Sequence, residues 1–355
     1  MDLPQTVESI KNEVDNYIRT VQALKAVANE LLFDDASRKL VSEGKAYFGR
    51  RLDTSSNNRI SPNNQVTPDL VISLPLKQNV VVEAKLAMSG DTDLRKSKLI
   101  ETQKYDDDLT GFDTNVTKVT GHDLILLVSF SHAKEIADHI VDLQKSQEIE
   151  FKKNFAIIRF IRNSERKTWF VLDLVSGGLT DQGKTKKLQK SVSIDMEHLI
   201  SNRHFGSIEF YDADPPLPLL MHKIHELMFN NLTREQSLLL QENNQVEVAV
   251  TVSKIRDQLA DSFGPGTASG DRTPDIPKSN CVDKAFQAFV RIGWARKIKV
   301  NSYIYDVRKR RKHFEQFCKF RAQELCKTVE EREKQRRREI EKLPLFKPLL
   351  EHEKD

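Results

Sequence analysis

VTPDLVISLPLKQNVVVEAKL, residues 66–86, is the stretch on which the interpretation of this chain depends. It contains two apolar runs rich in β-branched residues, separated by a short connection from Pro75 to Gln78. Runs of this length, bounded by proline and polar residues, are typical of paired strands. The pattern therefore predicts a hairpin of two strands, Val66–Leu74 and Asn79–Leu86.

The second predicted strand has two different faces, because successive side chains of a strand point to opposite sides. Its apolar face comprises Val80, Val82, Ala84 and Leu86. The other face carries Val81, Glu83 and Lys85, so that a carboxylate and an ammonium group lie side by side. Hairpin pairing brings Asp69 beside Glu83. Such a group of charges is costly to desolvate unless a cation or a substrate uses it.

These residues resemble a family signature. Pro68-Asp69 followed by Glu83-Ala84-Lys85 matches the motif of the PD-(D/E)XK nuclease superfamily, in spacing and in strand setting. The resemblance implies an α/β fold with a restriction-endonuclease-like core, in which helices flank a mixed sheet. The alternative is an ordinary surface hairpin with a solvated Glu–Lys face.

The resemblance also implies a chemistry, the metal-dependent hydrolysis of phosphodiester bonds. Asp69, Glu83 and the carbonyl oxygen of Ala84 would supply oxygen ligands to Mg²⁺ or Mn²⁺. The metal would lower the pKa of a bound water, and Lys85 would orient that water and offset charge in the transition state. We therefore expect a Mg²⁺-dependent endonuclease.

A further acid is expected on the first core helix, as in nucleases of the resembled family. Residues 5–47 are predicted to be helical with a break around Phe33, and FDDASRKLVSEGKAYF (33–48) resembles that core helix. Asp34 is the residue we carry over, with Glu30 and Glu43 as alternatives. An Asp at this position also suits a helix cap.

Gln103 is expected to support the site from the next helix. Some nucleases of the superfamily, the RecB-like exonucleases among them, have a glutamine on the helix after the lysine strand. Gln103 resembles it and lies on a helix predicted from Asp91 to about Leu109. Tyr105 follows two positions later, whereas the family tyrosine follows four positions later. A solvated amide is the alternative for Gln103.

The order of the predicted elements agrees with the core that the motif requires. His122–Ser129 is an apolar run suited to a buried central strand. A helix is predicted over Ser131–Gln147, and strands are predicted over Phe155–Arg162 and Thr168–Leu174. Local pattern and motif therefore indicate the same fold.

The composition is that of a polar chain that still folds. Of its 355 residues 38% are hydrophobic and 30% are charged, and this length suits two domains and a tail. No apolar run approaches a membrane span and the N-terminus is not a signal peptide, so we expect no membrane partner. Three scattered cysteines favour a reducing, cytoplasmic location.

The second half of the chain predicts a DNA-binding module. Asp212–Pro218 (DADPPLP) is the expected boundary of a nuclease-like domain over residues 1–212. Within residues 213–306, three predicted helices and a hairpin over Trp294–Tyr305 resemble a mainly helical winged-helix domain. Cations on or near its third helix and wing would contact phosphates. They are Lys278, Lys284, Arg291, Arg296, Lys297 and Lys299.

Residues 307–355 are predicted to form a basic tail with one long charged helix. Residues 306–342 contain fourteen Lys and Arg against eight Asp and Glu, a net charge of +6. This charge suits a nucleic-acid backbone, and a solvated helix or a dimer arm is an equal alternative. We expect a nucleic-acid partner, DNA rather than RNA, and leave a homodimer or a partner subunit of a multi-protein system open.

Two further motifs are interpreted as structural. Residues 178–185 (GLTDQGKT) match the phosphate-loop pattern, but a poor apolar helix follows, which favours a glycine-rich turn with a lysine cluster. His222 and His225 lie three positions apart on a helix without a completing ligand, which favours surface histidines over a metal site.

The sequence thus predicts a nuclease in restriction, phage defence, or transposition and recombination. The first alternative is a non-catalytic DNA-binding or scaffolding protein with an inactive nuclease fold. A nucleotide-driven enzyme that uses residues 178–185 is the second alternative.

Overall fold

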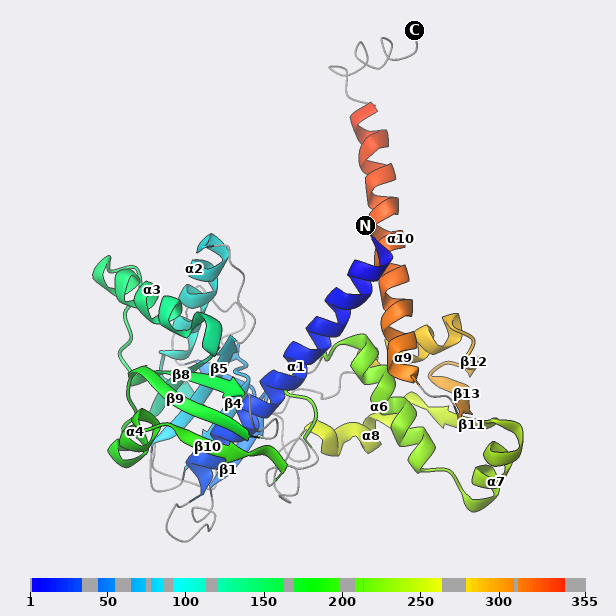
Figure 1. The fold of residues 1–355 in the computed structure, drawn as a ribbon, viewed down its shortest axis with the longest axis horizontal. Coiled ribbons are helices and arrows are strands. Elements are labelled where there is room, and N and C mark those ends of the chain that lie inside the picture. Colours follow the sequence, from blue (N-terminus) through cyan, green and yellow to red (C-terminus); the bar gives the residue numbers. More distant parts are fainter. Residues whose placement is uncertain are drawn as a thin grey trace. The chain divides into compact units, whose positions relative to one another are not determined.

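A computed structural model describes residues 2–33, 44–54, 65–74, 78–85, 92–112, 121–162, 169–197, 208–212, 214–263, 279–309 and 312–341. These residues form two compact units (Figure 1). The sheet unit comprises residues 16–215 and 252–282, and the hairpin unit comprises residues 2–15, 216–251 and 283–341, within the described ranges. Both units are discontinuous in sequence, whereas the sequence predicted three consecutive segments.

The sheet unit contains a seven-stranded mixed sheet with the order β1-β4-β5-β7-β8-β9-β10. The strands are β1 (Lys45–Phe48), β4 (Leu70–Ser73), β5 (Asn79–Lys85), β7 (His122–Ser129), β8 (Phe155–Arg162), β9 (Trp169–Gly177) and β10 (Val192–Asp195). β5, β7 and β8 run parallel, and the other neighbouring pairs are antiparallel. The chain is therefore an α/β protein with a large mixed sheet.

β5 lies between β4 and β7 in the middle of this sheet, and most of it is buried on both faces. Val80 and Val82 are buried on one face, and Val81 is buried on the other. The core cluster around Val81 includes Val71, Tyr105 and Leu124. The prediction of a single apolar face was wrong in this respect, because the polar part of the second face is confined to the end of the strand.

Helices cover the face of the sheet that contains Val81. α2 (Thr92–Glu101) continues into a one-turn helix, η1 (Thr102–Tyr105), and α3 (Ala133–Lys145) follows the turn η2 (Phe130–His132). Side chains of α2 and α3 form one core cluster with β7 and β8. This cluster includes Leu99, Leu126, Val128, Ile136, Ile140 and Ile157. The helix predicted as far as Leu109 thus ends earlier, at Glu101, and η1 turns the chain back to the sheet.

The remaining elements of the sheet unit lie around this core. A small sheet has the order β3-β2-β6, formed by β2 (Leu52–Thr54), β3 (Gln65–Val66) and β6 (Leu109–Thr110). α4 (Gln182–Gln189) connects β9 to β10, and α8 (Val252–Leu259) continues into η3 (Ala260–Phe263). α1 (Leu3–Leu32) ends beside the break predicted at Phe33. The second helix predicted there falls on residues 34–43, outside the described ranges.

The hairpin unit contains a three-stranded sheet with the order β11-β13-β12. Its elements are α6 (Leu217–Asn230), α7 (Arg234–Asn243), β11 (Gln245–Thr251), α9 (Ser279–Arg291), β12 (Ala295–Lys299), β13 (Ser302–Arg308) and α10 (His313–Glu341). Aromatic rings in mutual contact form its core, among them Phe286, Phe289, Trp294, Tyr303, Tyr305 and Phe317. The predicted helices near 217–228 and 281–292 and the predicted hairpin are confirmed. The remaining predicted helix of this module, over about 252–261, is also present as α8 but belongs to the sheet unit.

Two elements of this region were not predicted, α7 and β11. β11 pairs with β13 along its whole length, from Gln245 opposite Arg308 to Thr251 opposite Ser302. The predicted two-stranded hairpin is therefore part of a three-stranded sheet. The link predicted over Gly264–Asn280 falls mostly on residues outside the described ranges.

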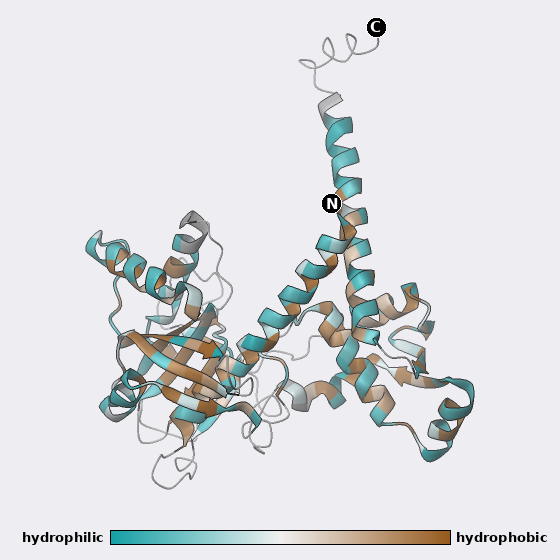
Figure 2. Cartoon of the chain, viewed as in Figure 1, coloured by the Kyte–Doolittle hydropathy of each residue, from teal (hydrophilic) through white to brown (hydrophobic). Residues whose placement is uncertain are grey.

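α10 begins at His313 rather than at the predicted Val307, because β13 continues to Arg308. Its first turns pack against the N-terminal part of α1 through Ile10, Cys318 and Ala322. Figure 2 shows that the later turns of α10 are mostly hydrophilic. None of the described helices has an apolar stretch long enough to cross a lipid bilayer.

Candidate active site

The β4–β5 hairpin brings Asp69 and Glu83 together. Leu70 pairs with Val82 in the antiparallel register, so Asp69 and Glu83 are the next pair along the ladder. The Asp69 carboxylate accepts a hydrogen bond from the backbone N–H of Ala84, with 2.7 Å between Oδ2 and N. The two carboxylates therefore lie side by side where the hairpin opens.

Glu83 is held by a hydrogen bond at each carboxylate oxygen. The Lys85 ammonium donates to Oε1 over 2.5 Å, and the Tyr105 hydroxyl donates to Oε2 over 2.8 Å. Glu83 is only 6% exposed, whereas Lys85 is half-buried. Because charge-assisted hydrogen bonds are strong in a partly desolvated site, they fix the orientation of this carboxylate.

Tyr105 reaches Glu83 from η1, the one-turn helix after α2. Its ring is fully buried in the core cluster that contains Val81. The ring nitrogen Nε2 of His122 lies 2.6 Å from the Tyr105 carbonyl oxygen, and since a carbonyl only accepts, Nε2 carries a proton. His122 at the start of β7 thus anchors the backbone of Tyr105, and the Tyr105 hydroxyl anchors Glu83.

Burial and mutual repulsion dominate the electrostatics of the site. Burial raises the pKa of Asp69 well above its usual value, and the neighbouring Glu83 carboxylate raises it further. Burial alone would lower the pKa of Lys85, but the surrounding carboxylates, Glu83 foremost, together outweigh burial and raise this pKa. Burial and Glu83 also raise the pKa of Tyr105, so its hydroxyl stays a donor.

A segment that follows β10 contributes a third carboxylate near Asp69. The charge of Asp212 adds to the rise in the pKa of Asp69, after the larger contributions named above. The Tyr17 hydroxyl of α1 donates to Asp212 Oδ1 over 3.2 Å, and its ring stacks on Tyr211 with centroids 4.7 Å apart. The sequence interpretation assigned Asp212 only to a domain boundary.

The residues present fit a divalent cation of the Mg²⁺ type. Asp69 and Glu83 offer hard oxygen donors, and Mg²⁺ is commonly held by one or two carboxylates together with water and substrate phosphates. The raised pKa of Asp69 shows that its ionised form is disfavoured beside Glu83, and a bound cation would compensate the charge of both carboxylates. Within the described ranges no cluster of three or more His, Cys, Asp and Glu side chains is arranged as a complete metal site. A metal here would therefore rest on this pair, the Ala84 carbonyl and water.

Of the other predicted supporting residues, Gln103 and Glu30 have contacts elsewhere in the sheet unit. The Gln103 amide donates to the Glu150 carbonyl oxygen over 3.5 Å. Glu30, one alternative for the first-helix acid, forms an ion pair of 2.7 Å with Lys187. Asp34 and the other alternative, Glu43, lie outside the described residues.

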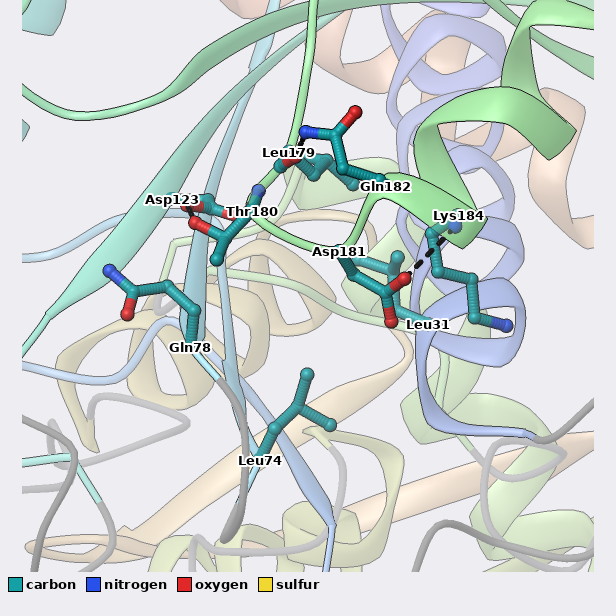
Figure 3. A pocket seen from close by; sticks show the side chains of 9 residues that line it. All are labelled: Leu31, Leu74, Gln78, Asp123, Leu179, Thr180, Asp181, Gln182 and Lys184. Carbon is teal, nitrogen blue, oxygen red and sulfur yellow. Dashed lines mark hydrogen bonds between the residues drawn. The ribbon is translucent and has the colours of Figure 1, made fainter.

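The loop that matches the phosphate-loop pattern leads into a helix, α4, which the sequence interpretation did not expect. Asp181 caps this helix, because its side chain accepts hydrogen bonds from the backbone N–H groups of Gly183 and Lys184. These are the donors that a phosphate would need. Figure 3 shows the bond from Lys184. The Lys184 ammonium donates to the carbonyl oxygens of Glu30 and Phe33 at the end of α1. Donors and lysine are thus both engaged within the protein.

A cavity of about 500 Å³ lies beside this loop (Figure 3). Its lining includes Gln78, which precedes β5, and Asp123 at the start of β7. The buried Asp123 carboxylate accepts hydrogen bonds from the backbone and the hydroxyl of Thr180, both over 2.7 Å. Glu83 and Lys85 lie at the C-terminal end of β5, whereas Gln78 precedes its N-terminal end. The cavity and the paired carboxylates are therefore at opposite ends of this strand.

The expectation that His222 and His225 are both surface residues was wrong for His225. It is buried, and its Nδ1 lies 2.7 Å from the Tyr305 hydroxyl. Its ring also contacts the ring of His313, with centroids 4.1 Å apart. Burial, with the charges of His313 and His222, lowers the pKa of His225 to about 3. His225 is thus a neutral core residue of the hairpin unit.

The predicted DNA-binding cations belong to two elements of the hairpin unit. Lys284 and Arg291 lie on α9, and Arg296, Lys297 and Lys299 lie on β12. Arg291 pairs with Glu324 of α10, and Arg296 pairs with Glu247 of β11 over 2.8 Å. Lys278 is outside the described residues.

In comparisons with known proteins, no protein-family model, no curated protein and no solved structure matches this chain.

Proposed function

We propose that this chain is a metal-dependent nuclease that hydrolyses phosphodiester bonds in DNA. The observation that carries the proposal is the arrangement of Asp69, Glu83 and Lys85 where the β4–β5 hairpin opens. Two oxygen donors suited to Mg²⁺ beside one ammonium group form a set that metal-assisted attack on a phosphodiester requires.

The sheet unit supports a restriction-endonuclease-like core. In this assignment β4 leads from Asp69 into the hairpin, and β5 is the central strand that carries Glu83 and Lys85. A mixed sheet in which antiparallel β1, β4 and β5 are followed by parallel β7 is compatible with the PD-(D/E)XK resemblance. The β4–β5 register makes the two acids the next pair along the ladder.

Each residue has a separate role in the proposed reaction. Asp69 and Glu83 hold the metal, and the Ala84 carbonyl is a further ligand. When bound, Mg²⁺ supplies a water of lowered pKa and compensates charge on the scissile phosphate. The Lys85 ammonium, which donates to Glu83 here, orients the attacking water and offsets transition-state charge. Tyr105 keeps Glu83 in place as a hydrogen-bond donor.

The hairpin unit is proposed to bind the DNA. A helix followed by a two-stranded hairpin, α9 with β12 and β13, supports a winged-helix assignment, in which α9 would enter a major groove. Lys284 and Arg291 on α9 would contact phosphates together with the cations of β12. Arg291 and Arg296 would exchange their carboxylate partners for phosphates on binding.

The test is incubation of the purified full chain with single-stranded, duplex and branched DNA and RNA, in Mg²⁺, Mn²⁺ or EDTA. We expect cleavage of DNA that requires the metal. Lys85→Ala lowers the cleavage rate by about 10²–10³-fold and leaves DNA affinity unchanged, because phosphate contacts come from the hairpin unit. Lys96→Ala is the matched control, since Lys96 also pairs with a glutamate, Glu148, that has no role in the proposed site.

Two results would contradict the proposal. Full cleavage by Lys85→Ala would show that the assigned residues are not the catalytic site. Tight, salt-sensitive DNA binding by the wild-type chain without cleavage in any metal would instead support the non-catalytic DNA-binding alternative.

A further inference from the structure

The tip of the β12–β13 hairpin exposes two large aliphatic side chains. Ile298 is 57% exposed and Val300 is 78% exposed, and Val300 is the most exposed of the large hydrophobic residues in the described chain. The turn is short, because Lys299 pairs with Ser302, and Asn301 adopts the left-handed conformation that Asn tolerates. The two side chains therefore project from a narrow, well-defined turn.

A β-bulge directs one of these side chains outward. Lys297 pairs with Tyr303 and Lys299 pairs with Ser302, so Ile298 has no partner in the ladder. A bulge bends the strand and re-aims a side chain, and bulges are common next to functional sites. Residues 296–299 are all exposed.

Cations flank the two aliphatic residues. Lys297 and Lys299 are exposed and form no ion pair with another described residue, and Arg296 is engaged by Glu247. β12 is an edge strand, where lysines protect against pairing with other chains. That role explains the lysines but not Ile298 and Val300, which favour such pairing.

We propose that Ile298 and Val300 form a wedge that enters the minor groove of duplex DNA and partly unstacks a base step. Proteins that bend DNA insert aliphatic side chains in this way, and nearby cations contact the phosphates on either side. The proposal rests on the proposed function for its choice of DNA as the partner. It adds that the bound DNA is kinked at the hairpin tip.

The small size of the exposed tip favours DNA as its partner over a membrane or another protein. Ile298 and Val300 together have fewer carbons than one myristoyl chain, which alone gives only marginal membrane binding. A narrow hairpin tip is also much smaller than the roughly 1,000 Å² that a stable protein interface needs. A DNA groove requires only a narrow insert, and cationic contacts supply the remaining affinity.

The test uses the full chain in EDTA, so that DNA is bound without being cut. The duplex carries a fluorescent adenine analogue that brightens on unstacking, and end labels that report bending by energy transfer. Ile298→Ser with Val300→Ser is the wedge variant. Leu238→Ser with Leu239→Ser on α7 is the matched control, since these residues are 52% and 46% exposed in the same unit.

We expect wild-type protein and control variant to unstack and bend the duplex. The wedge variant should lose both signals and bind about tenfold more weakly with an unchanged salt dependence. Lys297→Ala with Lys299→Ala should instead lower the slope of log affinity against log salt by about 2.

Unchanged unstacking and bending by the wedge variant would overturn the wedge, as would equal losses in the wedge and control variants. Binding of wild-type protein to anionic lipid vesicles that the wedge variant loses would also overturn it, in favour of a membrane. Failure of the proposed function looks different: the DNA is bound and bent, but Mg²⁺ produces no cleavage.

Discussion

The Tyr105 hydroxyl lies 2.8 Å from Oε2 of Glu83, and the Lys85 ammonium lies 2.5 Å from the other oxygen. A short helix and a strand are thereby joined at one carboxylate. The Tyr105 ring is part of the buried core, so the core of the sheet unit directly sets the orientation of a proposed metal ligand.

Tyr105→Phe is expected to lower the cleavage rate about 10–100-fold while the protein stays folded. The substitution keeps the buried ring and removes one hydrogen bond to a charged group, a loss of about 1.5–3 kcal/mol. The measurement is single-turnover cleavage in Mg²⁺. Tyr303→Phe is the control, because it removes a similar hydroxyl–carboxylate bond, to Asp283, in the hairpin unit. Equal rates for wild-type protein and Tyr105→Phe would show that Tyr105 has no positioning role.

Asp69→Asn is expected to stabilise the metal-free protein. The folded state raises the pKa of Asp69, so the folded state holds its proton more tightly and loses stability as the pH rises through that raised pKa. An amide can still accept from the Ala84 N–H and carries no charge. We expect a melting temperature higher by about 2–4 °C at neutral pH, and no difference near pH 3, below the ordinary pKa of aspartate. A lower melting temperature at neutral pH would contradict the electrostatic account of the site.

His225 is expected to make the hairpin unit sensitive to acid. Its pKa falls from 6.5 to about 3 on folding, so the unfolded chain binds the proton first. Stability is therefore present above pH 6.5 and falls by about 1.4 kcal/mol per pH unit as the pH drops toward 3. Denaturant unfolding followed by Trp294 fluorescence, in a Trp169→Phe background, measures this unit separately, since Trp294 contacts the His225 ring.

His225→Phe should flatten this dependence, and His222→Gln, which removes a half-buried partner of Glu226, should leave most of it. The same steep loss between pH 6.5 and 4 in His225→Phe would assign the acid sensitivity to another group.

Lys184→Met is expected to destabilise the sheet unit and to leave its response to ATP unchanged, because we expect no nucleotide binding at this loop. Lys184 donates over 2.6 Å and 3.0 Å to two carbonyl oxygens at the end of α1, and losing these bonds costs about 2–3 kcal/mol. Lys186→Met, on an exposed position of the same helix, should cost much less. Thermal unfolding with and without ATP checks both points. Stabilisation of the wild type by ATP that Lys184→Met loses would restore the phosphate-loop interpretation.

The strands were the most predictable part of the fold. β7 and β8 have the bounds expected from sequence, His122–Ser129 and Phe155–Arg162, because continuous apolar runs leave few other arrangements for buried strands. The pairing of Asp69 with Glu83 followed from hairpin geometry alone. Local pattern was less reliable for short strands: the predicted strand Val66–Leu74 is divided into β3 and β4, and β10 was not predicted.

Contacts between distant segments were not predictable. Gln103 was expected at the site because it resembles the family glutamine, but it is Tyr105, in η1, that contacts Glu83. Tyr211 and Asp212 approach the site from more than 120 residues beyond Glu83, and no local pattern encodes that distance.

Two missed helices had a capping signal in the sequence. Thr233 and Gln236 form a capping box at the start of α7, a pattern readable from their spacing. Asp181 caps α4, which lacks the apolar periodicity that would have indicated a helix. Apolar periodicity alone does not indicate helices whose start is set by polar side chains.

The central claim is that Asp69 and Glu83 hold one divalent ion together. Titration of Mn²⁺ into the full chain, followed by electron paramagnetic resonance, tests it without depending on catalysis. We expect one bound Mn²⁺ in the wild-type chain, none in Asp69→Asn or Glu83→Gln, and unchanged binding in Glu148→Gln. No bound Mn²⁺ in the wild-type chain, or equal binding in all four proteins, would contradict the account.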